Sequence, residues 1–172
     1  MSHELGIHSV LWRLLVERGV HGAEEARHFF RPSLTQLHDP FLLDGMKEAV
    51  DRINLALGRK ERILVYGDYD VDGTSAVTLV YKFLGRFTSN IDYYIPNREE
   101  EGYGISTPAL KYAIDSGVTL IIILDCGVKA IQEIAYAKSI GIDFIVCDHH
   151  VQDEELPPPA ALLKPNVNDS PS

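Results

Sequence analysis

The fold is decided by RILVYGDYDVDGTSAVTLVYKFLG, the stretch from Arg62 to Gly85. Its first part, Arg62–Tyr66, is a short run of Ile, Leu, Val and Tyr, which is typical of a strand covered on both faces. Gly67–Gly73 is an acidic turn, and Thr74–Gly85 carries apolar residues at helical spacing. The stretch therefore predicts a buried strand, an acidic turn and a helix, in that order.

The same alternation of strand and helix continues down the chain. Helices are predicted over Thr107–Gly117, which opens with Pro108, and over Val128–Ser139, which Gly141 closes. We therefore expect the α/β class, with a doubly wound, mostly parallel sheet of about five strands and flanking helices. In such sheets ligands gather at the carboxyl ends of the strands. The further strands that we predict are Ile91–Ile95, Thr119–Leu124, Asp143–Cys147 and Ala160–Leu163.

The residues before Arg62 have a helical pattern. Gly22–Phe30 is rich in Ala, Glu and aromatic residues, and Asp44–Gly58 places its apolar residues on one face, with Gly58 suited to the C-terminal cap. After Val151 the chain becomes polar and rich in proline. We predict a helical extension over 1–60, an α/β domain over 61–165, and a linker or truncated tail over 166–172.

Composition limits the class of protein. An apolar fraction of 45% in 172 residues suits one globular α/β domain with a short appendage. The sequence has no long apolar run and no signal peptide, so we expect a cytoplasmic protein with no membrane contact. In a reducing compartment Cys126 and Cys147 are expected to be two buried thiols, although parallel strands can bring such residues close enough for a disulfide.

The net charge of −9 argues against a chain that holds nucleic acid strongly by its phosphates, because such proteins usually carry a basic patch. Two bound divalent cations would change the formal charge from −9 to −5. The acidic residues are therefore candidates for metal ligands, and this chain alone is expected to bind a polyanion weakly.

Three aspartates alternate in the acidic turn. Asp68, Asp70 and Asp72 would share one side if the strand continued through them, and oxygen-rich sites of this kind suit Mg²⁺ or Mn²⁺. A calcium loop of the EF-hand type is disfavoured, because Leu79 occupies the position where that loop needs glutamate. The remaining alternative is an acidic turn that caps the following helix.

Two other predicted strands also end in acidic residues. Asp125 follows an apolar strand, where a carboxylate is costly unless it is paired, bound to metal or used as a helix cap. Asp148, His149 and His150 follow the next strand in the same way. Neighbouring side chains point in different directions, so one imidazole can bind metal while the other faces a substrate.

A fourth segment follows the strand Ile91–Ile95. Arg98 can form two hydrogen bonds to a phosphate, Tyr103 can stack on a base or sugar, and Gly104 allows close approach of the backbone. These residue types also fill many ordinary loops. Together the four segments indicate a site of several carboxylates with histidine, which is typical of phosphate-ester chemistry.

These residues resemble the DHH phosphoesterase superfamily, and specifically its RecJ-type single-strand DNA exonucleases. The resemblance covers nearly the whole chain. It is strongest in four ordered motifs, and the REEEGYG segment, Arg98–Gly104, favours the RecJ-type branch. The motifs that carry it are ILVYGDYDVDGTSA, IPNREEEGYGIS, LDCG and VCDHH, and it extends to ELPPPAALLKPN.

The resemblance implies a centre of two Mn²⁺ or Mg²⁺ ions. By position, Asp70 and Asp72 would each hold one metal, Asp125 would bridge the two, and His149 would complete the second site. In related branches a histidine stands where this chain has Tyr66, so Asp68 is the candidate to replace it as a ligand.

The resemblance also implies roles for the rest of the DHH segment. His150 would contact the scissile phosphate or assist proton transfer, and Asp148 would orient an imidazole. The implied reaction removes 5′-mononucleotides from single-stranded DNA in the 5′→3′ direction, in repair and recombination.

Family members carry a further aspartate ligand and a second domain after the DHH motif, and RecJ-type enzymes add a DNA-binding domain. Since this chain reaches only Ser172, we expect an incomplete site that lacks the C-terminal domains. Two alternatives stay open. One is a phosphoesterase for short oligonucleotides, cyclic dinucleotides or pyrophosphate, and the other is a DNA-binding relative without catalysis.

Overall fold

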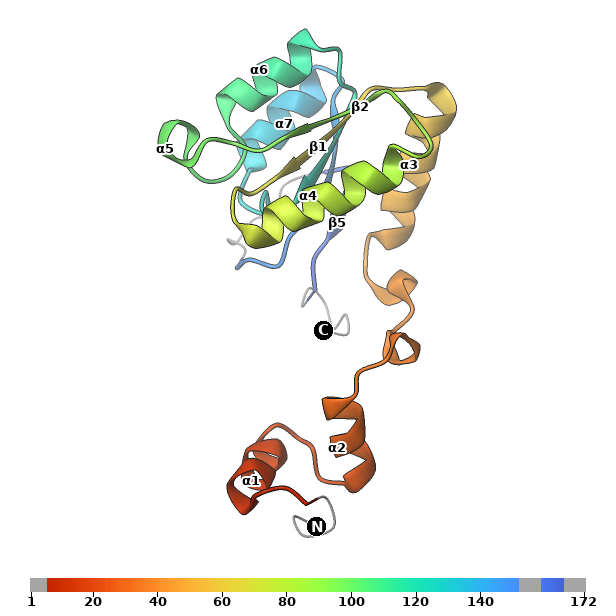
Figure 1. Ribbon diagram of the computed structural model, residues 1–172. Helices are drawn as coiled ribbons and strands as arrows, with labels where there is room; N and C mark the ends of the chain where they lie inside the picture. The colour runs from red at the N-terminus through yellow and green to blue at the C-terminus, as the bar shows by residue number, and fades with distance from the viewer. Residues whose placement is uncertain (1–5, 152–158, 166–172) are drawn as a thin grey trace. The chain divides into compact units, whose positions relative to one another are not determined.

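The computed structural model describes residues 6–151 and 159–165. The chain forms two compact units, which meet in sequence between Asp39 and Pro40 (Figure 1). In the first unit, Leu15, Val20 and Ala26 form a small apolar core. The helices of this unit are α1 (Ser9–Glu17), α2 (Ala23–Phe30) and the 3₁₀ helix η1 (Leu34–Gln36).

The second unit is built on one parallel sheet of five strands in the order β2-β1-β3-β4-β5. The chain runs from β1 to β2 on one side of β1 and then crosses to β3 on its other side. The prediction of a doubly wound parallel sheet is therefore confirmed. The strands are β1 (Ile63–Gly67), β2 (Ile91–Tyr94), β3 (Leu120–Leu124), β4 (Asp143–Cys147) and β5 (Ala161–Leu163).

Helices cover both faces of this sheet (Figure 1). On one face α3 (Met46–Arg59) and α4 (Val71–Leu84) pack over the strands, and on the other face lie α6 (Thr107–Asp115) and α7 (Ile131–Ser139). Every residue of β1 and β3 is buried, which explains their unbroken apolar sequences. Two short elements complete the unit, the 3₁₀ helix η2 (Pro40–Leu42) and α5 (Arg98–Glu101).

The helix α3 belongs to the second unit, although we had grouped it with a helical extension ending at residue 60. Gly45, at the N-terminal cap of α3, has a φ of 78°. A Cβ atom at this position would lie 2.3 Å from the carbonyl oxygen of Leu162 in β5, so only glycine allows this approach. The expected tail over 166–172 lies outside the described residues.

Several helix ends differ from the sequence-based expectation; α7, for example, begins at Ile131 and not at Val128, and α6 ends at Asp115 and not at Gly117. The helix α4 begins at Val71, not at Thr74, because the Asp70 side chain accepts a hydrogen bond from the Gly73 amide and caps the helix. The helix α3 ends with Lys60 in the left-handed region at φ 56°, so the predicted cap at Gly58 was wrong. Gly58 instead lies inside the last turn.

In the described part of the chain, no helix is both long enough and apolar enough to span a bilayer. Cys126 and Cys147 are free thiols; Cys126 is buried, as expected, whereas Cys147 is only partly buried.

Candidate metal and phosphate site

The acidic turn, the DCG segment and the DHH segment meet at the carboxyl edge of the sheet. The register aligns Gly67, Leu124 and Cys147, the last residues of β1, β3 and β4. The residues that follow these positions therefore leave the sheet side by side. The site lies where the chain reverses direction across the sheet, which is where ligands bind in open α/β folds.

Two glycines allow the acidic turn to fold tightly. A Cβ atom on Gly73 would lie 2.4 Å from the Asp68 carbonyl oxygen, and one on Gly67 would lie 2.4 Å from the Val77 side chain. The turn therefore packs closely against the start of α4. As a result Asp68 is buried, Asp70 caps the helix, and Asp72 lies exposed in its first turn. The three carboxylates do not share one side of a strand, so the alternation argument was wrong in its geometry.

Asp125 is held in an unusual backbone conformation. Its φ is 61°, in the left-handed region that L side chains other than Asn and Asp seldom adopt, and its amide donates to the Cys147 carbonyl at 2.8 Å. Burial raises the pKa of Asp125, and the negative charges of Asp72 and Asp70 raise it further. The nearest imidazole nitrogen, His149 Nε2, lies 3.1 Å from Asp125 Oδ1.

The Asp148 carboxylate holds the DHH segment in place through contacts to His150 and to the Val128 amide. Its Oδ1 accepts from the His150 amide at 3.0 Å and lies 2.8 Å from His150 Nδ1, and its Oδ2 accepts from the Val128 amide at 2.9 Å. Burial by itself would raise the pKa of Asp148, but these hydrogen bonds outweigh burial and lower it. Asp148 is therefore a buried, ionised acceptor that fixes the His150 ring.

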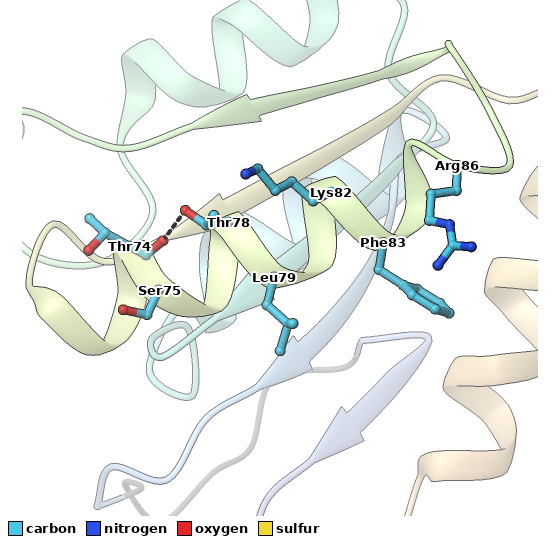
Figure 2. A pocket seen from close by; sticks show the side chains of 7 residues that line it. All are labelled: Thr74, Ser75, Thr78, Leu79, Lys82, Phe83 and Arg86. Carbon is cyan, nitrogen blue, oxygen red and sulfur yellow. Dashed lines mark hydrogen bonds between the residues drawn. The ribbon is translucent and has the colours of Figure 1, made fainter.

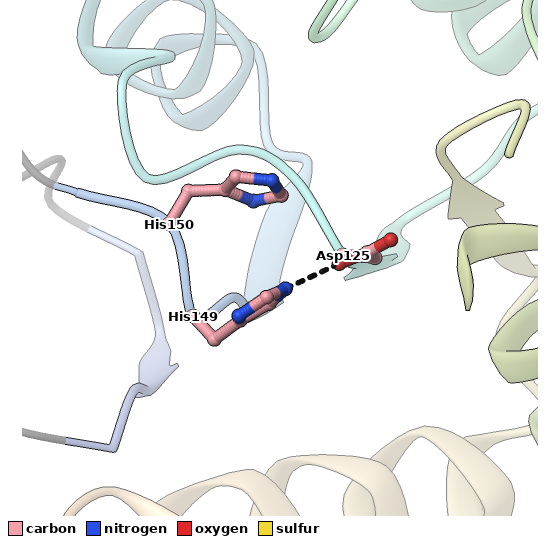
Figure 3. A group of neighbouring side chains, drawn as sticks. All are labelled: Asp125, His149 and His150. Carbon is pink, nitrogen blue, oxygen red and sulfur yellow. Dashed lines mark hydrogen bonds and ion pairs between the residues drawn. The ribbon is translucent and has the colours of Figure 1, made fainter.

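In the part of the chain that the structure describes, the side chains form two groups that could hold a metal ion, and both groups contain Asp125. One group is Asp68, Asp70 and Asp125, and the other is Asp125, His149 and His150. Within each group the candidate ligand atoms lie within 4.8 Å of one another. Figure 3 shows the second group, in which both imidazoles lie on the same side of Asp125. Asp72 belongs to neither group, although its charge acts on Asp125.

The Arg98–Gly104 segment, which begins with α5, contacts the acidic turn through Arg98 and the DHH segment through Tyr103. The Arg98 guanidinium lies 5.1 Å from the centre of the Tyr69 ring in the acidic turn. The Tyr103 hydroxyl lies 3.2 Å from His150 Nδ1. The Gly104 carbonyl accepts a 2.5 Å hydrogen bond from the hydroxyl of Tyr66 in β1. All three residues expected from the sequence to contact substrate therefore lie in a segment that contacts the site.

A cavity of about 450 Å³ lies beside His150. Its walls come from the loop after α5, the loop after β3, the start of α7 and the DHH segment. A larger cavity of about 650 Å³ lies on the outer face of α4, where the side chains include Thr78, Lys82 and Arg86 (Figure 2). That cavity has no acidic residue or histidine in its lining, so it does not belong to the metal site.

Sequence reasoning missed the polar residues that support the Arg98–Gly104 segment. Tyr94, Glu101 and Ser106 form a hydrogen-bonded cluster behind it, and Tyr66 adds the contact to Gly104. The sequence did contain one usable signal. Asn97 followed by three glutamates is typical of a helix N-terminus, and α5 begins there with Asn97 as its cap.

Comparison with known proteins identifies the family. The sequence pattern described as "DHH family, N-terminal domain" matches residues 62–172. The chain belongs to the DHH family. The segments Gly67–Gly73, Arg98–Gly104, Asp125–Gly127 and Asp148–His150 all lie within the matched residues.

Two relatives and one solved structure show how much of their own length this DHH-family chain covers. It is 39% identical over 165 residues to the single-stranded-DNA-specific exonuclease RecJ of Bacillus subtilis, which is 96% of this chain and 21% of the relative. The corresponding protein of Haemophilus influenzae is 35% identical over 169 residues, 98% of this chain and 29% of the relative. A crystal structure of exonuclease RecJ bound to manganese superposes with a TM-score of 0.69 at 28% identity, covering 79% of this chain and 36% of that one. The chain thus spans less than a third of the length of the curated relatives it matches.

Proposed function

We propose that the chain carries the metal-binding catalytic half of a phosphodiesterase that degrades single-stranded DNA from the 5′ end and releases 5′-mononucleotides. The observation that carries this proposal is the pair of ligand groups that share Asp125. The names of the relatives, which describe single-stranded-DNA-specific exonucleases, supply the substrate class.

The side chains at the carboxyl edge fit Mn²⁺ or Mg²⁺, two ions in number. Oxygen ligands with one or two imidazoles suit these metals, and a shared carboxylate suits a bridge between two ions. The raised pKa of Asp125 also fits, because the repulsion among Asp125, Asp70 and Asp72 is what a bound cation would relieve. Asp68, Asp70, Asp125 and His149 are the proposed ligands, and Asp72 joins them if its exposed side chain rotates inward.

When bound, the two cations would neutralise charge that develops on the phosphate oxygens during hydrolysis. The protein's own contribution begins with His150. Because ionised Asp148 lies 2.8 Å from Nδ1, that nitrogen carries the proton, and Nε2 is the atom left to exchange a proton with substrate or water. The Tyr103 oxygen, 3.2 Å from Nδ1, then acts as a second acceptor, so the Tyr103 hydroxyl hydrogen is available to a substrate oxygen.

The cavity beside His150 suits the sugar and base of one nucleotide. Its volume of about 450 Å³ lies within the usual range for small-molecule pockets. Its lining holds two carboxylates, Glu133 and Asp148, against one cation, Lys129, and this balance disfavours a phosphate. The Tyr103 and His150 rings offer faces against which a base can stack. Arg98, on the side of the acidic turn, is the proposed phosphate contact.

The wider setting is also proposed. A DNA substrate implies a cytoplasmic location, and the free Cys126 and Cys147 fit a reducing compartment. The compact unit that ends at Asp39 is separate from the α/β unit, and we propose an accessory role for it.

The test is hydrolysis and metal binding by this chain and its Asp125→Ala variant. Each is incubated with Mn²⁺ and one of three substrates: 5′-labelled single-stranded DNA, a dinucleotide or pyrophosphate. Mononucleotides released from long strands by the wild type, with Mn²⁺ binding weakened at least 100-fold in the variant, support the proposal. Cleavage of dinucleotides alone favours a phosphoesterase of short substrates. Metal binding without turnover favours a DNA-binding relative, and unchanged two-metal occupancy in the variant refutes the bridging role.

A further inference from the structure

The carboxylate of Glu101 links the Arg98–Gly104 segment to neighbouring parts of the α/β unit through three hydrogen bonds. Glu101 Oε1 accepts from the Asn97 amide at 2.8 Å, and Oε2 accepts from the Tyr94 hydroxyl at 3.0 Å. The Ser106 hydroxyl makes a short hydrogen bond to the same Oε2. These donors lie just before α5, in β2 and at the N-terminal cap of α6, so Glu101 connects three parts of the α/β unit.

The positions of these donors explain what the carboxylate does. Asn97 and Ser106 are the two ends of a 97–106 loop that contains the segment. Glu101 accepts a hydrogen bond from each of them. Ser106 is itself fixed, because its side chain is buried and accepts from the Ala109 amide at 3.1 Å to cap α6. The segment is thus closed into a loop whose ends cannot separate while Glu101 keeps its three partners.

The residues inside the loop have little other support. Tyr103 is 53% exposed, and it lies between Gly102 and Gly104, whose φ values are 77° and 91°. Glycine is the residue that gains the most freedom when a loop loosens. Besides the Glu101 contacts, the described loop is held to the sheet by the Tyr66 hydrogen bond to the Gly104 carbonyl and by Ile105, which packs against the core.

We propose that Glu101 is a positioning residue, which holds Arg98 and Tyr103 over the phosphate site by closing the 97–106 loop. This inference rests on the proposed function, since it assigns those two side chains to the substrate. Glu101 is suited to the task. Burial would raise its pKa, but the hydrogen bonds from Ser106, Asn97 and Tyr94 outweigh burial and lower it, so the carboxylate stays an ionised acceptor.

The first measurement needs no substrate. Amide hydrogen exchange is compared among the wild type, Glu101→Ala and Glu100→Ala. Glu100 is the matched control, because it is an exposed glutamate in the same short helix. We expect exchange at residues 98–106 to rise at least tenfold in Glu101→Ala and to remain unchanged in Glu100→Ala, with β1 and β3 protected in both. Equal protection of the loop in the two variants overturns the proposal.

The second measurement separates positioning from general damage. Hydrolysis of 5′-labelled single-stranded DNA is measured in Mn²⁺ for Glu101→Ala, for the Arg98→Ala/Tyr103→Ala pair and for the triple variant. If Glu101 acts through those two side chains, its removal raises KM about tenfold in the wild type and changes nothing further in the pair. Full additivity in the triple variant overturns the proposal. Mn²⁺ affinity is expected to remain unchanged in Glu101→Ala.

The two proposals can fail separately. If neither this chain nor a version extended at its C-terminus to the length of its relatives cleaves any of the substrates, the proposed function fails, while the exchange experiment still decides whether Glu101 closes the loop. If the wild type cleaves DNA and Glu101→Ala matches it in KM and in exchange, the role of Glu101 fails and the proposed function stands.

Discussion

The acidic residues at the two ends of the parallel strands have different partners. We call the side of the sheet where the strands begin the amino edge, and the side where they end the carboxyl edge. At the amino edge Arg52 donates to Glu61 and to Asp143, both at 2.7 Å, and Glu61 also accepts from the Thr119 hydroxyl at 3.0 Å. These residues precede or begin β1, β3 and β4. The acidic residues of this edge are therefore paired within the fold, with Arg52, which is only 13% exposed, and, for Glu61, also with Arg59.

At the carboxyl edge the same strands lead into acidic residues without such a partner. Asp68, Asp125 and Asp148 are buried, and among residues 6–151 and 159–165 none of them forms an ion pair with lysine or arginine. Their partners are backbone amides and imidazoles. Charge that the fold leaves without a cation is charge that is available to a metal ion, so the amino edge serves stability and the carboxyl edge serves function.

The largest expected effect comes from the backbone of the carboxyl edge. Gly73→Ala would place a Cβ atom 2.4 Å from the Asp68 carbonyl oxygen and 2.6 Å from its amide nitrogen. Because these are backbone atoms, they cannot rotate away, and we expect the free energy of unfolding to fall by about 3 kcal/mol or more. Urea denaturation measures this loss.

The control is the same substitution in the helix α3. A Cβ atom on Gly58 would meet no atom within 4 Å, and Gly58 lies inside the helix. Gly58→Ala is expected to raise the free energy of unfolding by about 0.5 to 1 kcal/mol. A small effect at Gly73 would show that the acidic turn is looser than its geometry indicates.

The second prediction breaks the amino edge. Arg52→Ala leaves Glu61, whose side chain is 13% exposed, without its principal cation. We expect the free energy of unfolding to fall by about 3 kcal/mol, because removing one partner of a buried pair leaves an uncompensated charge. Mn²⁺ affinity, measured by titration calorimetry, should not change. Arg59→Ala is the control, since Arg59 is 66% exposed and lies 3.9 Å from Glu61, and its loss is expected to cost less than about 0.5 kcal/mol.

The third prediction compares the two ends of β4. Asp148→Asn removes the charge that fixes the proton on His150 Nδ1, so turnover of single-stranded DNA should fall between about 10-fold and 100-fold. Mn²⁺ affinity should change much less. Asp143→Asn, at the other end of the same strand, removes the negative charge that pairs with Arg52 and should lower stability without changing turnover. An equal loss of turnover in both variants would contradict the division between the edges.

The sheet could be predicted from the sequence because its signals are local. The bounds of Asp143–Cys147 were correct, and the other strands differ from the prediction by at most one residue at either end. Runs of β-branched and aliphatic residues define such strands without knowledge of their neighbours. The strand ends then locate Asp125 and Asp148, so the position of the site also followed from the sequence.

The geometry within the site depends on contacts between distant segments. Asp70 caps α4 and Asp72 lies in its first turn because Gly73 packs against Asp68, and the alternation of aspartates does not reveal that contact. The role of Asp148 as an acceptor for the Val128 amide joins two loops that follow different strands. Glu101 likewise connects β2 to α6, so no local pattern identifies it.

The last prediction is that removal of one carboxylate charge changes the free energy of unfolding in opposite directions at the two edges. Asp125→Asn removes a buried charge that Asp72 and Asp70 repel, and asparagine tolerates the left-handed backbone at this position. We expect the metal-free chain to gain about 1 kcal/mol of unfolding free energy, at the expense of metal binding. Glu61→Gln makes the same chemical change at the amino edge, where the Glu61 carboxylate accepts from Arg52. We expect this variant to lose about 1.5 kcal/mol of unfolding free energy. Both are measured by urea denaturation in EDTA. If Asp125→Asn is also destabilising, the fold itself needs that charge, and the carboxyl edge is not reserved for a cation.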